Sequence, residues 1–449
     1  MSDSTREPAQ DGMTTNESRR AFLGKAAAVA GAGALIGAAS GSASAGLLPS
    51  VSRSGSLKPP APGDPVRMAV IGPGGMGTGH CQAFSTFAAD GRANVRIVAV
   101  ADVNDLHAAR GKRVIEERQG SDTVETYRDY REMIARDDIH GVLIASPEHW
   151  HAQHTIDAMT SGKDVYCEKP MTLRLDQAMD VRKVVLGNPD RIFQVGTQKM
   201  ILPKYVSARQ AIKDGKIGKP LWSQTSYCRN SPDGEWNYYG IDDKWEPGVN
   251  LDWDAWCGHL GPREWDPKVY IRWRRYRDFS TGIIGDLLVH EMTPMIHALD
   301  AGWPVRVAAT GSHMIDLDME NHDQVHLTVQ FENGHTMIVA GATNNEVGLE
   351  TMIRGDRANI YLGSRNCVIR PERAYADDVD AETLTGTDIG NDQDHLRLNW
   401  LECIRSRKPA VSNIDLASKV MVAVDLATRS MWDGHAYTVD PSSMRAGRV

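Results

Sequence analysis

Lys169 is the first residue whose setting in the sequence suggests chemistry. It follows the apolar run 164–167 and stands between Glu168 and Pro170. The run predicts a buried parallel strand, and open α/β folds bind their ligands at the carboxyl ends of such strands. Pro170 favours an extended backbone at Lys169, which holds the amine on a stiff segment. An amine held in this way suits catalysis, although a lysine at a strand end is more often a solvated surface charge.

A second candidate pair is Asp286 and His290, which are four residues apart. If this segment is helical, the two side chains share one face. The pair could then bind a substrate hydroxyl and accept its proton as hydride leaves the same carbon, with the carboxylate orienting the imidazole ring. Taken alone, the spacing fits an ordinary helix pair better.

A glycine-rich turn indicates a dinucleotide. Gly72, Gly74 and Gly77 follow a predicted strand and precede a helical pattern. Glycines at these places allow a tight turn, close approach of the backbone to a pyrophosphate, and close helix packing. The next predicted strand, Val95–Val100, leads to Asp102, whose carboxylate can bind ribose hydroxyls and repels a 2'-phosphate. We therefore predict NAD as the cofactor rather than NADP.

Three histidines close together, His149, His151 and His154, raise the question of a metal. No carboxylate or thiol completes a ligand set, so we interpret them as polar groups that line the cofactor crevice. The six cysteines also lack metal-ligand spacing, and no metal is predicted. The predicted cofactor-binding residues are Gly72, Gly74, Gly75, Met76, Gly77, Asp102, Ser146, His151, Glu168, Lys169 and Gln198.

Length and composition describe a globular chain with two folded domains. The chain has 449 residues, of which 41% are hydrophobic and 24% charged, and its formal net charge is -8. This acidic balance argues against nucleic acid and membrane surfaces as partners and favours a small molecule. Alternating strand and helix patterns predict a parallel sheet over residues 65–195, and a second domain follows over residues 196–449.

Three motifs together resemble the Gfo/Idh/MocA family of sugar and polyol oxidoreductases: residues 72–77, residues 146–151 and Glu168-Lys169-Pro170. The resemblance covers essentially everything after residue 64. It implies an α/β protein in which an N-terminal Rossmann dinucleotide-binding domain is followed by an α/β domain with a large, mostly antiparallel open sheet. It also implies a homo-oligomer, a dimer or tetramer that associates through the face of the second sheet.

The resemblance also implies a catalytic set. Asp286 and His290 match the family's Asp-x-x-x-His in the substrate domain, whose usual partner is the lysine of Glu-Lys-Pro, here Lys169. One departure is that residues 287–289 are Leu-Leu-Val, where the family often has glycine-rich sequence. This departure puts the substrate subgroup in doubt rather than the site.

The segment between Trp222 and Tyr276 is rich in Trp, Tyr and Arg. Aromatic faces with polar tips suit sugar rings, so a carbohydrate substrate is expected here. An aromatic core or a subunit interface explains any single one of these side chains equally well. The candidates are Trp236, Trp253, Trp256 and Trp273.

Residues 1–45 resemble a twin-arginine export signal. Arg19 and Arg20 precede an apolar segment rich in alanine and glycine, and Ala43-Ser44-Ala45 supplies a small-residue cleavage site. Residues 46–64 read as a flexible linker. We therefore expect a protein that is exported folded to the periplasm or the extracellular space.

Three functions are compatible with these features. The first is an NAD-dependent oxidoreductase acting on a hydroxyl of a sugar, polyol or glycoside, with tightly bound nicotinamide. The alternative is a redox-neutral glycoside hydrolase that proceeds by oxidation, elimination, water addition and reduction. A binding protein without catalysis is disfavoured, because Lys169, Asp286 and His290 are all present.

Overall fold

A computed structural model describes residues 47–48, 59–121 and 123–449. The predicted signal, residues 1–45, lies outside the described residues, as does most of the predicted linker 46–64. Within the described part of the chain, no helix is long and apolar enough to cross a membrane.

The first sheet is entirely parallel, with strand order β3-β2-β1-β4-β5-β6. Its strands are β1 (Val66–Ile71), β2 (Val95–Ala101), β3 (Glu125–Tyr127), β4 (Gly141–Ile144), β5 (Asp164–Cys167) and β6 (Phe193–Val195), and its helices are α1 (Gly75–Ala89), α2 (Asp105–Gln119), α3 (Tyr130–Ile134), α4 (His151–Thr160) and α5 (Leu175–Gly187). The central strands β1 and β4 are mostly apolar and buried, because helices cover both faces of the sheet. The predicted parallel sheet is confirmed.

The second sheet has ten strands in the order β14-β13-β12-β11-β7-β10-β9-β8-β15-β16, and only the β7–β10 pair is parallel. Its strands are β7 (Pro220–Cys228), β8 (Pro304–Ser312), β9 (Gln324–Phe331), β10 (Thr336–Ala342), β11 (Met352–Gly355), β12 (Ala358–Leu362), β13 (Asn366–Pro371), β14 (Glu382–Thr385), β15 (Tyr437–Asp440) and β16 (Arg445–Arg448). Buried and exposed residues alternate along β9, because one face of the sheet packs on helices and the other does not. The mostly antiparallel sheet is confirmed.

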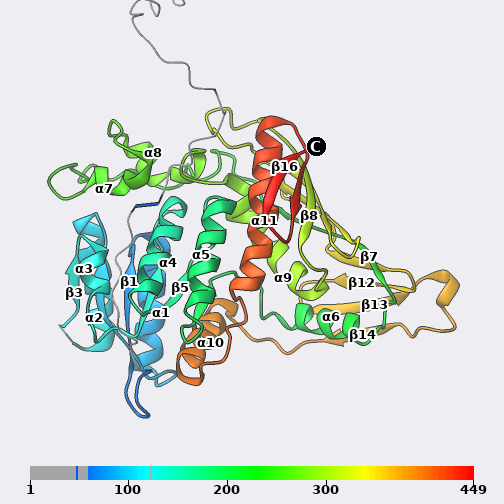
Figure 1. Cartoon of the computed structure of the whole chain (residues 1–449), viewed down its shortest axis with the longest axis horizontal. Coiled ribbons are helices and arrows are strands. Elements are labelled where there is room, and N and C mark those ends of the chain that lie inside the picture. The colour runs from blue at the N-terminus through cyan, green and yellow to red at the C-terminus, as the bar shows by residue number, and fades with distance from the viewer. Residues whose placement is uncertain (1–46, 49–58, 122) are drawn as a thin grey trace, which may run out of the picture. The chain divides into compact units, whose positions relative to one another are not determined.

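Three helices pack on the buried face of the second sheet: α6 (Pro203–Lys213), α9 (Val289–Leu299) and α11 (Ile414–Asp433). Helix α11 also contacts α5, so it lies between the helices of the first sheet and the strands of the second (Figure 1). One apolar core therefore continues from the first sheet into the second.

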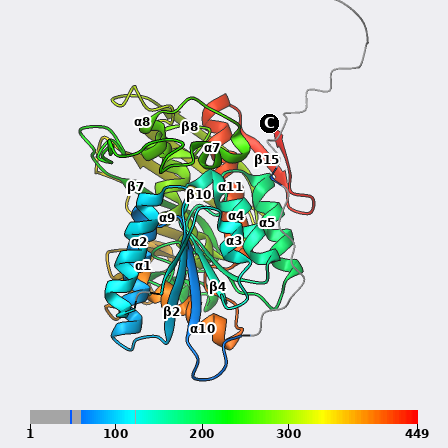
Figure 2. The ribbon, with the colours of Figure 1, turned by 90° about the vertical axis from the view of Figure 1, so that its left-hand side faces the viewer.

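Helix α10 (Asp392–Ser406) follows β14 of the second sheet in the chain but packs against the first sheet. Its fully buried Trp400 contacts Gly141 on β4 so closely that a Cβ at this glycine would lie 2.9 Å from the indole ring. Figure 2 shows α1 and α2 on one face of the first sheet and α3, α4 and α5 on the other, with α10 below the strands.

The segment 229–282 follows β7 and contains the short helices α7 (Trp253–Cys257) and α8 (Pro267–Ile271). Its residues 245–258, here called the strap, lie across the carboxyl end of the first sheet (Figure 1). Leu251 forms a β-bridge with Asn104, and the Asp105 N–H donates to the Asn250 carbonyl at 2.9 Å. The strap thereby covers the edge at which a Rossmann fold binds its nucleotide.

Candidate active site

A cavity of about 810 Å³ lies between the carboxyl ends of the first sheet and the strap. Nine of the predicted cofactor-binding residues line it: Gly72, Gly74, Gly75, Met76, Asp102, Ser146, His151, Glu168 and Lys169. Gly77 and Gln198 do not. Gly77 packs inside the turn, and Gln198 lies in the turn after β6, outside the cavity wall.

The glycine turn fits a pyrophosphate. Gly72 has φ +79°, and a Cβ there would lie 2.7 Å from the Ser146 nitrogen, so only glycine is accommodated. A Cβ at Gly77 would overlap the carbonyl oxygen of Gly72. Helix α1 begins at Gly75, where a Cβ would meet open space, and within the described chain no side chain caps its N-terminus. Its free N–H groups and positive dipole end therefore remain available to phosphate oxygens.

Asp102 stands at the other end of this part of the cavity, directly after β2. Its Oδ1 accepts from the Asn104 N–H at 2.9 Å. Arg128 also lines the cavity, but its guanidinium is held by the Asp105 carboxylate and by the Val249 carbonyl at 2.7 Å. The Asp102 carboxylate suits the hydroxyls of an NAD ribose. Because Arg128 is already bonded to Asp105, it does not offset the repulsion between Asp102 and a 2'-phosphate.

The three histidines form internal hydrogen bonds. His149 bonds to a main-chain carbonyl of the strap, and His154 to the Ser146 hydroxyl. His151 Nδ1 lies 2.7 Å from the Pro170 carbonyl, which fixes the chain beside Lys169. Only His151 and His154 line the cavity. In the described part of the chain, no three potential metal-ligating side chains are grouped.

Lys169 and Asp286 are brought together from the two sheets. Lys169 Nζ donates to the Asp286 carboxylate oxygen Oδ1 and to its main-chain carbonyl, both at 2.8 Å. Arg274 Nε donates to the same Oδ1 at 2.9 Å. Burial alone would raise the pKa of Asp286, but the charges of Lys169 and Arg274 hold it well below its usual range. Lys169 and Arg274 line the cavity, whereas the ionised Asp286 lies behind them.

No hydrogen bond joins Asp286 and His290 in the described part of the chain, although the charge of Asp286 acts on the imidazole. Asp286 lies in η4 (Ile284–Leu288), a π-helical turn, and His290 lies in the first turn of α9. The Asp286 carboxylate is bonded to Lys169 and Arg274 instead, so it does not orient the imidazole.

His290 is neutral and lies outside the lining of the cavity. Burial, reinforced by the charge of Lys169, lowers the pKa of His290 to about 3. The ring is therefore neutral at physiological pH. Its buried Nδ1 has no hydrogen-bond partner among the described residues.

Glu168 is held by two residues that the sequence did not indicate. Arg397 Nε on α10 donates to His80 Nδ1 at 3.0 Å, so His80 Nε2 carries the hydrogen and donates to Glu168 Oε1 at 2.7 Å. Burial alone would raise the pKa of Glu168, but His80 and the charge of Lys169 lower it to about 2. Glu168 is therefore an ionised residue of the cavity wall beside Lys169.

Most of the aromatic candidates belong to the core. Trp236, Trp253 and Trp256 are buried, and the last two pack against Tyr270 in a separate aromatic cluster. The core interpretation therefore holds for these three, although the edge of Trp256 reaches the cavity. Trp273 differs, since it is partly exposed and lines the cavity next to Arg274.

Comparison with known proteins matches both parts of the chain. Residues 66–197 match the profile described as "Oxidoreductase family, NAD-binding Rossmann fold", and residues 209–439 match "Oxidoreductase family, C-terminal alpha/beta domain". These are the two domains of the Gfo/Idh/MocA family. The match confirms the Rossmann fold and the prediction of NAD as the cofactor.

Individual relatives share about a third or less of their sequence with this chain. An inositol 2-dehydrogenase of Rubrobacter xylanophilus is 32% identical over 193 residues, which are 42% of this chain and 49% of that protein. The chain thus spans about half the length of the curated relatives it matches. An NAD-binding oxidoreductase of Klebsiella pneumoniae superposes with a TM-score of 0.63 at 20% identity, over 84% of this chain and 99% of that one. A levoglucosan dehydrogenase in complex with NADH and L-sorbose gives 0.64 at 19% identity, over 84% and 99%. These structures share the fold.

Proposed function

The chain belongs to the Gfo/Idh/MocA family of oxidoreductases, and from this membership we propose that it oxidises a hydroxyl group of a sugar, polyol or glycoside with NAD. The observation that carries the proposal is the position of Lys169. Its amine lines the same cavity as the glycine turn and Asp102, and it is bonded to Asp286 from the second domain. The predicted dinucleotide site and the proposed catalytic lysine therefore lie in the same cavity.

NAD, when bound, accepts the hydride that leaves the substrate carbon. Lys169, paired with the ionised Asp286, donates a hydrogen bond to the substrate oxygen and stabilises the negative charge that develops on it. His290, which lies behind the cavity wall with Asp286, is the proposed acceptor of the hydroxyl proton, so one C–H bond and one O–H bond break as the carbonyl forms. Asp286 positions the amine through its two contacts.

The substrate class is supported by two kinds of evidence. Trp273 and Tyr239 present aromatic surface at the cavity wall, which suits the apolar faces of a sugar ring. The relatives are named as dehydrogenases of inositol, a polyol, and a structural neighbour as a dehydrogenase of levoglucosan. The hydrolytic alternative gains no specific support from these comparisons.

A substrate screen tests the proposal. Purified protein is incubated with neutral sugars, sugar acids, polyols and aryl glycosides while the absorbance of reduced nicotinamide is followed. Reduction of NAD by at least one sugar or polyol is expected. Release of the aglycone from an aryl glycoside without net NADH would instead identify a hydrolase.

Export and assembly complete the proposal. The twin-arginine pattern in residues 1–45 supports transport of the folded protein to the periplasm or beyond. The exposed side of the second sheet, where Leu221 and Trp222 on β7 are 44% and 37% exposed, supports association into a dimer or tetramer. Light scattering that found only monomer at working concentration would contradict the assembly.

A further inference from the structure

We infer that the substrate carries a carboxylate group, and that Arg274 binds it. The inference rests on the proposed oxidation of a hydroxyl group and narrows its substrate class to sugar acids or carboxylated polyols. Arg274 lies in the cavity wall beside Lys169. No motif in the sequence singles this arginine out.

The guanidinium of Arg274 has unused donors. An arginine side chain carries five N–H donors. In the described chain, Arg274 uses one of them, in the hydrogen bond from Nε to Asp286 Oδ1 at 2.9 Å. Its side chain is 21% exposed, at the cavity. The terminal nitrogens are therefore free to form the paired hydrogen bonds that guanidinium makes with a carboxylate.

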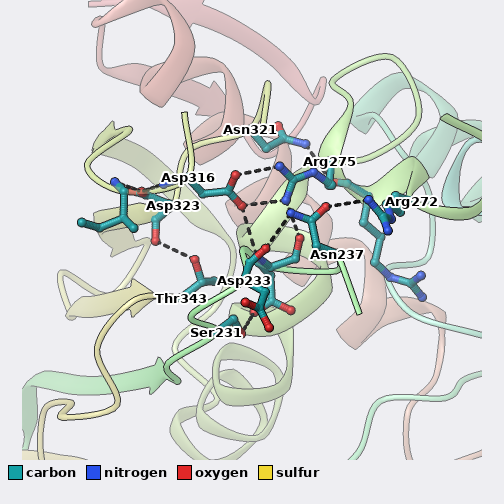
Figure 3. A network of polar contacts seen from close by, with 12 residues as sticks. Ser231, Asp233, Asn237, Arg272, Arg275, Asp316, Asn321, Asp323 and Thr343 are labelled. Carbon is teal, nitrogen blue, oxygen red and sulfur yellow. Dashed lines mark hydrogen bonds and ion pairs between the residues drawn. The ribbon is translucent and has the colours of Figure 1, made fainter. Parts of the chain in front are cut away.

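The surrounding structure holds Arg274 in place. Its neighbour Arg275 points the other way, into a buried ion pair with Asp316 in which both contacts are 2.6 Å (Figure 3). The Asn321 side-chain amide donates to the Arg274 carbonyl at 3.0 Å, which fixes the main chain. The guanidinium itself lies over the Trp273 ring, 4.2 Å from its centroid. A rigid, stacked arginine loses little freedom when it binds an anion.

The ion pairs at this end of the cavity leave Arg274 available to an anion. Lys169 contacts Asp286 twice, so that carboxylate is held without Arg274. Glu168, the other ionised acid beside Lys169, is hydrogen-bonded to His80 and has no hydrogen bond to Arg274 among the described residues. The terminal donors of Arg274 therefore have no acceptor in the described chain, and a substrate carboxylate would supply one.

The two cations also define how the substrate lies. Lys169 Nζ and Arg274 Nε contact the same oxygen atom, so the two cations are neighbours in the cavity wall. One small molecule can therefore place a hydroxyl on Lys169 and a carboxylate on Arg274. A monosaccharide acid satisfies both contacts.

Binding measurements test the inference independently of turnover. Calorimetry on the NAD-loaded full chain compares D-glucuronate with D-glucose, and D-galacturonate with D-galactose. We expect the dissociation constant of at least one acid to be lower than that of its neutral partner by about tenfold or more, as charge-assisted arginine contacts provide. Arg274→Gln should abolish this preference, so that acid and neutral sugars bind within about twofold of each other, and Arg274→Lys should restore only part of it.

Arg277→Gln is the matched control. Arg277 lies on the same segment, but its side chain bonds to the Glu320 carbonyl and lies over Trp432 rather than in the cavity. Equal affinity for acid and neutral sugars in the parent protein overturns the inference, as does a preference that survives Arg274→Gln. If neutral sugars are oxidised while acids neither bind nor react, the inference fails and the proposed function stands. If acids bind through Arg274 but no sugar reduces NAD, the inference stands and the proposed function fails.

Discussion

Lys169 contacts Asp286 twice, through the carboxylate and through the main-chain carbonyl, and both hydrogen bonds are 2.8 Å long. The two residues come from different sheets. Lys169 follows β5 of the first sheet, and Asp286 lies in the π-helical turn that precedes α9 under the second. The amine is therefore fixed only when both halves of the molecule are assembled around the cavity.

Replacing Lys169 with alanine should abolish turnover while leaving the fold intact. The substrate oxygen would lose its nearest cation, which we expect to lower kcat by about 10² to 10⁴. Asp286 would keep its partner Arg274, so no unpaired buried charge results. Initial rates on the best substrate of the screen measure the effect, and NAD binding by the same protein serves as the control. Wild-type turnover by this variant would remove the assignment.

Features next to strand ends were predictable from sequence. Lys169, Asp102 and the glycines directly follow β5, β2 and β1, and parallel strands bring their carboxyl ends to one edge. For these residues, a local pattern combined with the topology of a parallel sheet is sufficient. The second sheet, by contrast, was expected only from the family resemblance.

Contacts that depend on distant packing were not predictable. Arg397 reaches His80 across 317 residues of sequence, because α10 returns beneath the first sheet. Arg274 and Arg275 are adjacent and chemically identical, yet one faces the cavity and the other a buried aspartate. The π-helical turn at Asp286 also has no local signature in the sequence.

Asp102 should make the protein selective for NAD over NADP. A 2'-phosphate placed against this carboxylate is repelled, and Arg128 is already engaged by Asp105. We expect a dissociation constant for NADP about tenfold or more above that for NAD, and Asp102→Ser should reduce the ratio. Fluorescence titration of nucleotide-free protein measures both constants. Asp90→Ser, at the far end of α1, is the control, and equal constants in the parent protein would contradict the prediction.

Glu148 should make stability depend on pH. It lies in η1 (Glu148–Trp150), and its carboxylate accepts from the Thr281 N–H and hydroxyl, just before the helix that carries Asp286. Burial, only partly offset by Thr281, raises the pKa of Glu148 from 4.5 to about 7. Between these values the folded chain holds a proton that the unfolded chain has lost. The free energy of unfolding therefore falls as pH rises from 4.5 to 7, by on the order of 3 kcal/mol from this group.

Urea unfolding at pH 4.5, 5.5, 6.5 and 7.5 measures this effect. Glu148→Gln keeps an acceptor for Thr281 but does not ionise, so its unfolding free energy should fall less over this range than that of the parent. Glu117→Gln, at an exposed position on α2, should follow the parent protein. Parallel pH profiles for the parent and Glu148→Gln would show that the buried carboxyl does not titrate in this window.

The strap should keep NAD bound through purification. It joins the loop after β2 at several points: the Asp252 N–H donates to the Val103 carbonyl at 2.9 Å, and Arg128 donates to the Val249 carbonyl at 2.7 Å. The Asn104 side-chain amide donates to the Tyr270 hydroxyl at 2.9 Å, which ties α8 to the same loop. Because these contacts enclose the Asp102 end of the cavity, release of the adenosine half requires the strap to open.

Retention of NAD also matches the proposed export of the folded protein, since a nucleotide inserted in the cytoplasm must then be regenerated within the catalytic cycle. Denaturing freshly purified protein and assaying the supernatant should yield close to one NAD per chain. Tyr270→Phe removes the hydroxyl that accepts from Asn104, so exchange with labelled NAD should be several-fold faster, whereas Tyr361→Phe on β12 should exchange like the parent. Protein that is purified empty and is fully active only with millimolar added NAD would refute retention and leave the site assignment untouched.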